Sequence, residues 1–127
     1  MAYEIKAHDN ILKYAAPGSY IVMPVTVSNT GVNADSDGRK IIAAGTPLES
    51  DGSGTIRNDH DDAKEISVAA NAEGLLFNEV DVTAGDVTGS MLIKGVVDGD
   101  KLPTMPTGTA AVLKAFGIHI IGDYTEA

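Results

Sequence analysis

Oxygen-bearing side chains recur at alternate positions between Asn33 and Gly38, in the sequence Asn-Ala-Asp-Ser-Asp-Gly. A calcium-binding loop begins in this way, because calcium prefers several oxygen ligands around a sharp turn. The rest of an EF-hand loop is missing: Lys40 stands at the eighth position, which is normally apolar, and Ala44 at the twelfth, which needs a bidentate glutamate. We therefore predict a loop whose Asn and Asp side chains bond the local backbone, with calcium binding as the alternative.

One histidine lies among three carboxylates in the sequence Asp-His-Asp-Asp at residues 59–62. Imidazole and carboxylate groups together serve as zinc ligands or as general bases. Consecutive residues of one loop do not converge on a point without further ligands, however, and His8 and His119 lie in unrelated segments. We interpret residues 59–62 as a solvated acidic loop. We expect His119, in an apolar strand, to be partly buried with a hydrogen-bond partner.

No other group of residues has the pattern of a catalytic site. Ser53 lies between two glycines, but in a segment too flexible to hold a nucleophile rigidly. Glu79 and Asp81 fall on one face of a strand, yet glycoside chemistry also requires a cleft and aromatic sugar platforms. The chain has four tyrosines, two phenylalanines and no tryptophan. We therefore expect no enzymatic activity, no cofactor and no metal site.

The elements that would position these residues are mostly strands. They are rich in β-forming residues or alternate between apolar and polar side chains, and glycine, proline and polar clusters separate them. A polar segment rich in Gly, Ser, Asp and Asn reads as an exposed loop, and the segment after it suggests a short strand. The predicted strands cover residues 20–27, 39–44, 63–72 in part, 75–82, 91–97 and 118–121, and the exposed loop covers residues 49–62.

A short helix is predicted near the C-terminus. Val112, Leu113 and Phe116 fall at helical spacing, Thr109 can cap the start, and Gly117 can end it. The predicted fold class is therefore mainly β with a short C-terminal helix, a small α+β or barrel-like unit.

The chain has the size of a single domain. Its 127 residues can bury a core, and the absence of cysteine excludes disulfides and thiolate metal sites. Residues 1–18 are weakly patterned and end in a Pro-Gly turn, so we expect a loose N-terminal arm followed by one β-rich domain at residues 19–127. Pro24 removes a backbone donor from its strand, which predicts an edge strand or a bulge.

The charge limits the partners. Acidic residues outnumber basic ones 18 to 9, giving a net charge of −9. We therefore expect no nucleic acid partner and no anionic membrane surface as a partner, because both require clustered Lys and Arg. No signal-peptide pattern or membrane-length apolar stretch is visible, so we expect a protein made in a cytoplasm and kept there or carried in a particle.

Four segments in order resemble the head decoration proteins of tailed phages, typified by the lambda head decoration protein. They are a Gly-Thr-Pro-Leu step at residues 45–48, the strand at residues 74–83, the Leu-Ile-Lys-Gly-Val strand at residues 92–96, and a late short helix leading into residues 118–121. The resemblance covers residues 39–121. It implies a non-enzymatic protein of the virion, placed on the outer surface of an expanded capsid, which it stabilises.

The resemblance also implies partners and contact residues. Such proteins gather as homotrimers at local threefold positions and bind the major capsid protein, often through an N-terminal arm that adds a strand to a capsid sheet. We expect the docking residues to be Tyr3, Ile5, Ile11 and Leu12. We expect Leu75 and Phe77 to contribute to the seam between subunits.

Two alternative functions stay open. One is another structural virion component, such as a head fibre base or a tail protein, which differs by its place in the particle. The other is a small ligand- or carbohydrate-binding β module, which would need a concave pocket lined with aromatic side chains.

Overall fold

The computed structural model describes residues 11–13, 16 and 18–127, and it is mainly β with a short C-terminal helix, as predicted. The strands are β1 (Ile21–Val27), β2 (Ile41–Ile42), β3 (Pro47–Ser50), β4 (Ala63–Glu65), β5 (Gly74–Leu76), β6 (Val80–Asp81), β7 (Val87–Asp98) and β8 (Ile118–Ile121). The helices are α1 (Ile56–Asp59), α2 (Thr109–Ala115) and the 3-10 turns η2 (Ala69–Asn71) and η3 (Gly99–Lys101).

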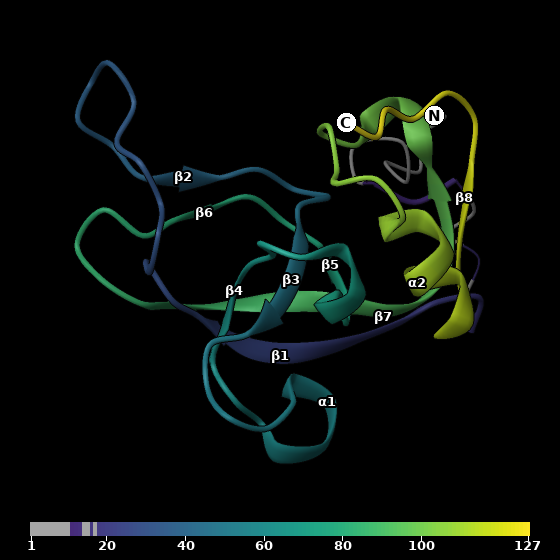
Figure 1. Ribbon diagram of the computed structural model, residues 1–127, viewed down its shortest axis with the longest axis horizontal. Helices are drawn as coiled ribbons and strands as arrows, with labels where there is room; N and C mark the ends of the chain where they lie inside the picture. The colour runs from purple at the N-terminus through teal and green to yellow at the C-terminus, as the bar shows by residue number, and fades with distance from the viewer. Residues whose placement is uncertain (1–10, 14–15, 17) are drawn as a thin grey trace, which may run out of the picture.

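The main sheet closes on itself. Its strand order is β1-β4-β3-β5-β7-β8, and β1 also pairs with β7, so that β1, β4, β3, β5 and β7 form a small barrel. β8 extends the sheet beyond β7, and β2 and β6 form a separate two-stranded sheet (Figure 1). Closure protects most strand edges from pairing with other chains.

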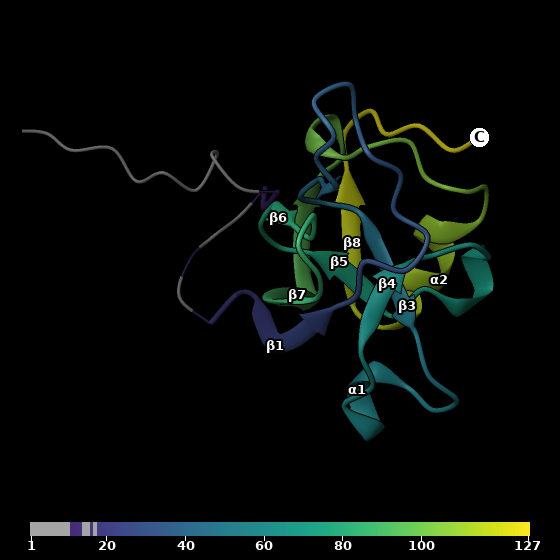
Figure 2. The ribbon, with the colours of Figure 1, turned by 90° about the vertical axis from the view of Figure 1, so that its left-hand side faces the viewer.

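β7 is the longest strand and connects the two parts of the molecule. Its first half pairs with β1 in antiparallel register, from Val87 opposite Val27 to Lys94 opposite Ile21, with a shift between Ile21 and Val22. Its second half pairs with β8 in parallel, from Gly95 opposite Ile118. The view in Figure 2 shows β7 beside β8, with α2 beyond them.

Two groups of buried apolar side chains form the core, one on each half of β7. The first fills the barrel: Val25, Val27, Val32, Ile42, Leu48, Ile56, Ala63, Leu76, Val82 and Met91. The second lies under α2 and β8: Ile11, Leu12, Ala72, Leu75, Leu92, Val97, Leu113 and Ile118.

The predicted exposed loop at residues 49–62 is wrong in part. Glu49 is only 6% exposed, and α1 interrupts the loop because Ile56, its one large apolar residue, is fully buried in the barrel. The helix is a single turn that Thr55 caps by accepting a hydrogen bond from the Asn58 amide. Residues 51–54, 58–60 and 62 keep the expected solvent exposure.

Two other predicted strands are shorter than expected. The alternating segment at residues 75–82 is split into β5 and β6, because the chain leaves β7 after the Phe77 amide donates to the Ser90 carbonyl and then pairs with β2. The strand predicted at residues 39–44 is reduced to Ile41–Ile42. Alternation thus identified extended backbone but not the change of partner.

The C-terminal helix and strand are confirmed, but the predicted cap is not. Gly108 is the N-cap, and the buried Thr109 donates its hydroxyl to the Pro106 carbonyl at 2.7 Å. A carboxylate distant in sequence takes the capping role, since Glu126 accepts the Ala110 amide at 2.9 Å. Gly117 follows the helix with φ of 96°, as expected of a C-terminal glycine.

Candidate functional site

Two of the four predicted docking residues lie in the core, and the other two lie outside the residues that the structure describes. Ile11 and Leu12 are each 2% exposed and belong to the core under α2. The Lys13 amide donates to the Val96 carbonyl and the Asp98 amide to the Ile11 carbonyl, both at 2.8 Å, so this segment adds to the edge of β7. The arm predicted at residues 1–18 is therefore not loose at residues 11–13. Tyr3 and Ile5 lie outside the described residues.

Both residues predicted at the seam between subunits make contacts within the monomer: Leu75 lies in the core, and Phe77 packs on a neighbouring ring. Leu75 is fully buried, because its side chain points into the core under α2. Phe77 is half-buried and stacks on Tyr20, with ring centroids 6.0 Å apart and an angle of 11° between the rings. In this conformation Leu75 has no surface to offer to another subunit, and Phe77 offers only part of its ring.

The acidic residues after α1 hold the loop rather than a ligand. Asp61 accepts the Ser50 hydroxyl at 2.6 Å and the Gly54 amide at 2.8 Å, and Asp59 accepts the Thr55 amide at 2.8 Å. His60 has φ of 56° and ends the helix. The carboxylates of Asp59 and Asp61 are thus bonded to the turn itself.

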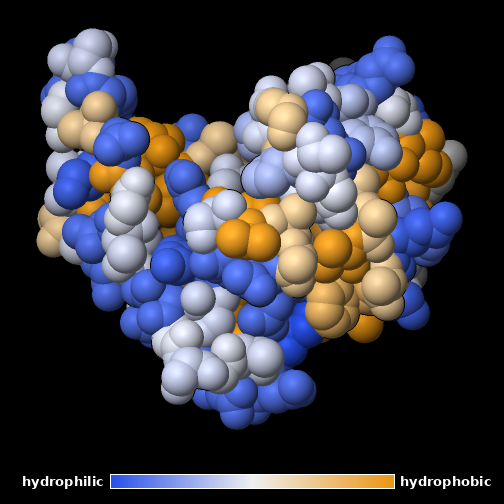
Figure 3. Space-filling model, in the orientation of Figure 1, coloured by the Kyte–Doolittle hydropathy of each residue, from blue (hydrophilic) through white to orange (hydrophobic). Residues whose placement is uncertain are grey.

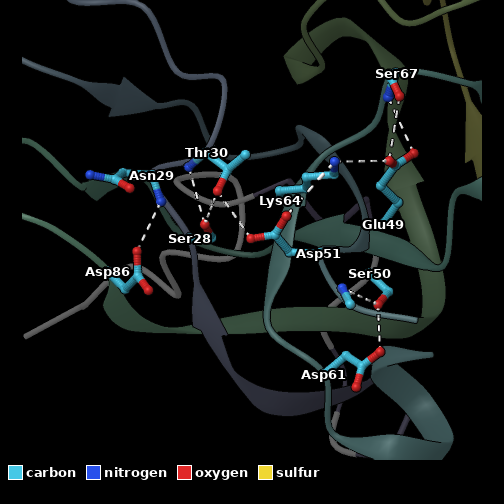
Figure 4. Close-up of polar contacts among 11 residues, drawn as sticks. Ser28, Asn29, Thr30, Glu49, Ser50, Asp51, Asp61, Lys64, Ser67 and Asp86 are labelled. Carbon is cyan, nitrogen blue, oxygen red and sulfur yellow. Dashed lines mark hydrogen bonds and ion pairs between the residues drawn. The ribbon is translucent and has the colours of Figure 1, made fainter. Parts of the chain in front are cut away.

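A second polar network lies beside the first and connects β3 and β4 with neighbouring loops (Figure 4). Glu49 accepts the Ser67 amide at 3.2 Å and lies 3.7 Å from the Lys64 ammonium, which also lies 3.8 Å from Asp51. Asp51 in turn accepts the Thr30 hydroxyl at 3.0 Å. These carboxylates are paired with cations, hydroxyls and amides of the chain itself.

The loop from Asn33 to Gly38 is an Asx-type turn. Asp35 accepts the amides of Asp37 and Arg39 at 2.9 and 3.0 Å through a single carboxylate oxygen. Its own amide donates to the Arg39 carbonyl, which closes the turn. Because Asp35 organises the backbone, its role matches the predicted loop.

A groove lies between α1, η2 and the end of α2, and sequence reasoning did not identify its key residues. It has a volume of about 650 Å³ and is lined by Glu49, Ser50, Gly52, Gly54, Thr55, Arg57, Asn58, Ala70, Asn71, Ala72, Glu73 and Phe116. Phe116 is the one aromatic among these residues, and the Arg57 guanidinium stacks 4.3 Å from its ring centroid. A ligand module of the kind considered above would need more aromatic surface than this.

Arg57 and Glu73 fasten α1 to the sheet. Glu73, only 8% exposed, accepts the Ile56 amide at 2.8 Å and the Arg57 amide at 3.1 Å. The Arg57 guanidinium donates to the carbonyls of Glu73 and Ile93. Burial lowers the pKa of Arg57, and the negative charge of Glu73 offsets part of this change. The sequence feature that could have indicated this contact is the carboxylate of Glu73, placed directly before the buried strand β5.

The remaining predicted candidates lie on the surface. His119 is exposed, not partly buried as predicted, because it points away from the core while Ile118 points into it. Asp81 is exposed, and the pKa of its carboxyl is lowered first by the Thr83 hydroxyl, then by the Thr83 amide and Arg39. Glu79 is exposed near Asp81, and no groove described above includes either residue.

Within the described ranges, no group of three or more His, Asp or Glu side chains could hold a metal ion. Every buried side-chain nitrogen or oxygen in the same part of the chain has a hydrogen-bond partner. The fold itself therefore satisfies the buried polar side chains of the described residues.

Exposed apolar side chains gather on the half of the molecule that carries α2. Figure 3 shows apolar colour over α2 and a polar lobe around α1. Phe116, Ile121 and Tyr124 are each at least 40% exposed here, and Val68 is 53% exposed. Ile21 and Val22 are exposed on β1. Exposed apolar patches are typical of contacts with other proteins.

None of the helices in the described part of the chain is long and apolar enough to cross a membrane. The amino-acid sequence matches no protein-family model and no curated protein.

Proposed function

We propose that this chain is a capsid decoration protein that binds the outside of an expanded phage head and stabilises it, as trimers at local threefold positions, without enzymatic activity. The proposal rests on the resemblance described above. Its four segments correspond to regular elements of this fold: the step into β3, strand β5 with β6, the middle of β7, and the passage from α2 to β8.

The observation that best supports the proposal is that residues 11–13 are held in place by the core and by β7. Ile11 and Leu12 are fixed in the core, so the ten residues before them start from a defined point beside Asp98 at the end of β7. Tyr3 and Ile5 stand in that preceding segment at alternate positions, the spacing that a strand added to a sheet requires. We assign Ile11 and Leu12 to the anchor, and Tyr3 and Ile5 to docking on the major capsid protein.

The polar residues support a structural role. The carboxylates of residues 49, 59, 61 and 73 all accept bonds from the chain's own backbone or side chains. A net charge of −9 favours solubility where many copies accumulate. A head fibre base or tail component would share these properties and would be distinguished by where the protein lies in the particle.

The test is co-sedimentation with expanded, undecorated shells of the phage that encodes the chain. The structure shows where to truncate the chain. Removal of residues 1–10 keeps the anchor at residues 11–13, whereas a longer truncation would remove core residues. We expect saturable binding by the full chain and weaker binding by the truncated chain, with equal thermal stability. Absence of binding by the full chain would exclude the decoration role, and equal binding by both would exclude Tyr3 and Ile5 as docking residues.

A further inference from the structure

We propose that the free edge of β8 is a self-association surface, on which two copies of this chain pair their β8 strands antiparallel about a twofold axis. β8 ends the strand order of the main sheet, and among the described strands it pairs only with β7. Figure 1 shows β8 at the margin of the molecule. The unpaired edge of a strand presents N–H and C=O groups to which another strand can bind.

The described residues around this edge leave room for a second strand. A groove of about 580 Å³ runs between β8 and α2, lined by Val96, Ala110, Ala111, Lys114, His119, Ile120, Ile121 and Tyr124. Ala110 and Ala111 form the helical wall, and their small side chains let another backbone approach. Ile121 and Tyr124 are 46% and 40% exposed, so apolar surface would be covered when the edge is paired.

The charges along the edge favour a second copy of this chain as the binding partner. Lys114 and His119 lie in the groove near the start of β8. The end of β8 is acidic, because Asp123 follows the strand and its amide donates to the Asp100 carboxylate at 3.0 Å. Antiparallel pairing about a twofold axis brings the basic start of each strand to the acidic end of the other. Parallel pairing would place like charges together, which is unfavourable.

The alternation of side chains fixes the register. Directly opposite residues in an antiparallel pair point to the same face. A twofold axis at Ile120 therefore places His119 opposite the partner's Ile121 on the outer face. Both side chains are exposed in the monomer, so the pairing covers them without disturbing the core.

The contact is small, and the association is correspondingly weak in dilute solution. A strand of four residues covers less area than the interfaces of stable dimers. Many copies held close together on one surface would pair far more often than the same copies in solution. The inference does not depend on the proposed function, because it concerns the chain alone.

The test is sedimentation velocity of the full chain from about 10 μM to about 1 mM, where weak association becomes visible. We expect a monomer–dimer equilibrium. Ile121→Lys should weaken it at least tenfold by placing a charge on the paired face, whereas Val68→Lys, at an equally exposed apolar position away from β8, should not. The double variant K114E/H119E should also weaken it by making both ends acidic, whereas Lys40→Glu near β2 should not.

Thermal unfolding of each variant shows whether it is folded, and the exposed positions are chosen so that the core is untouched. Protection of the Ile118 and Ile120 amides from hydrogen exchange should rise with protein concentration, because these groups lie on the strand that pairs. A chain that stays monomeric at the highest concentration would overturn the proposal. Association that folded Ile121→Lys leaves unchanged would overturn it as well.

Discussion

Single residues show how far this fold depends on buried carboxylates. Glu73 accepts two amides at the start of α1, a helix too short to be stable by itself. Arg57 completes the arrangement by donating to the carbonyl of Glu73, just before β5, and to that of Ile93 in β7. The one-turn helix is therefore held by side chains from distant parts of the sequence.

We predict that Glu73→Ala lowers the free energy of unfolding by about 2 kcal/mol, because two buried amides lose their acceptor. Urea denaturation followed by circular dichroism measures the change. Glu79→Ala is the matched control, since Glu79 is an exposed carboxylate, and it should leave stability nearly unchanged. Equal effects of the two substitutions would contradict the role given to Glu73.

A second residue-scale prediction concerns pH. The pKa of Asp81 is lowered in the folded protein, chiefly by the Thr83 hydroxyl, so its contribution to stability is present above its ordinary pKa and is lost as the pH falls through the folded-state pKa. Asp81→Asn should therefore reduce the melting temperature slightly at neutral pH and leave it unchanged at strongly acidic pH. Melting curves across the acidic range check this, and a difference that grows toward low pH would refute it.

At the scale of elements, local pattern predicted α2 and β8 well. Val112, Leu113 and Phe116 have helical spacing, and Gly117 ends the helix. The sequence did not show that residues 75–82 change partner between β5 and β6, because alternation looks the same on either sheet. It also did not show that Ile56, within a polar segment, is buried in the core, since a single apolar residue has no periodicity.

The same limit applies to the candidate site. The Asp35 turn could be predicted, because an Asx turn forms from neighbouring residues. The pairing of Glu73 with α1 and the free edge of β8 could not be, because they depend on contacts between segments distant in sequence.

Close approach of β5 and β7 supports a prediction at Gly74. A Cβ at this position would clash with the Leu92 carbonyl oxygen and lie 2.8 Å from the Met91 Cγ. We expect Gly74→Ala to destabilise the fold by about 3 kcal/mol, because backbone and core must both shift. Gly18→Ala is the control, as nothing lies within 4 Å of its Cβ position and only the positive φ opposes it. Denaturant midpoints should separate the two variants clearly.

The C-terminal segment provides another test of an element. Met105, Thr107 and the last residues of the chain exchange backbone hydrogen bonds, and Glu126 caps α2 at Ala110. Glu126→Ala should cost about 1 kcal/mol, as the loss of a helix cap does. Hydrogen exchange at Ala110 should accelerate more than exchange in β1. Uniform acceleration through the whole protein would argue against a local role.

At the scale of the whole molecule, the two cores meet along β7. β1 closes the barrel on its first half, and the segment at residues 11–13 and β8 flank its second half. The described part of the chain therefore begins in the core under α2, with Ile11 and Leu12, and reaches the barrel core within β1. This arrangement explains why the division into an arm at residues 1–18 and a domain at residues 19–127 does not follow the packing.

The last prediction concerns Ile11 and Leu12, which belong to the core and not to a loose arm. Removal of residues 1–10 should leave the melting temperature unchanged, whereas Leu12→Ala should cost about 3 kcal/mol, because a fully packed leucine leaves a cavity. Removal of residues 1–12 should cost more, since Ile11 is equally buried and its carbonyl bonds the Asp98 amide. Calorimetry on the three variants measures these changes. If Leu12→Ala were as stable as the full chain, the anchor would be peripheral, and the docking arm would have to begin further along the sequence.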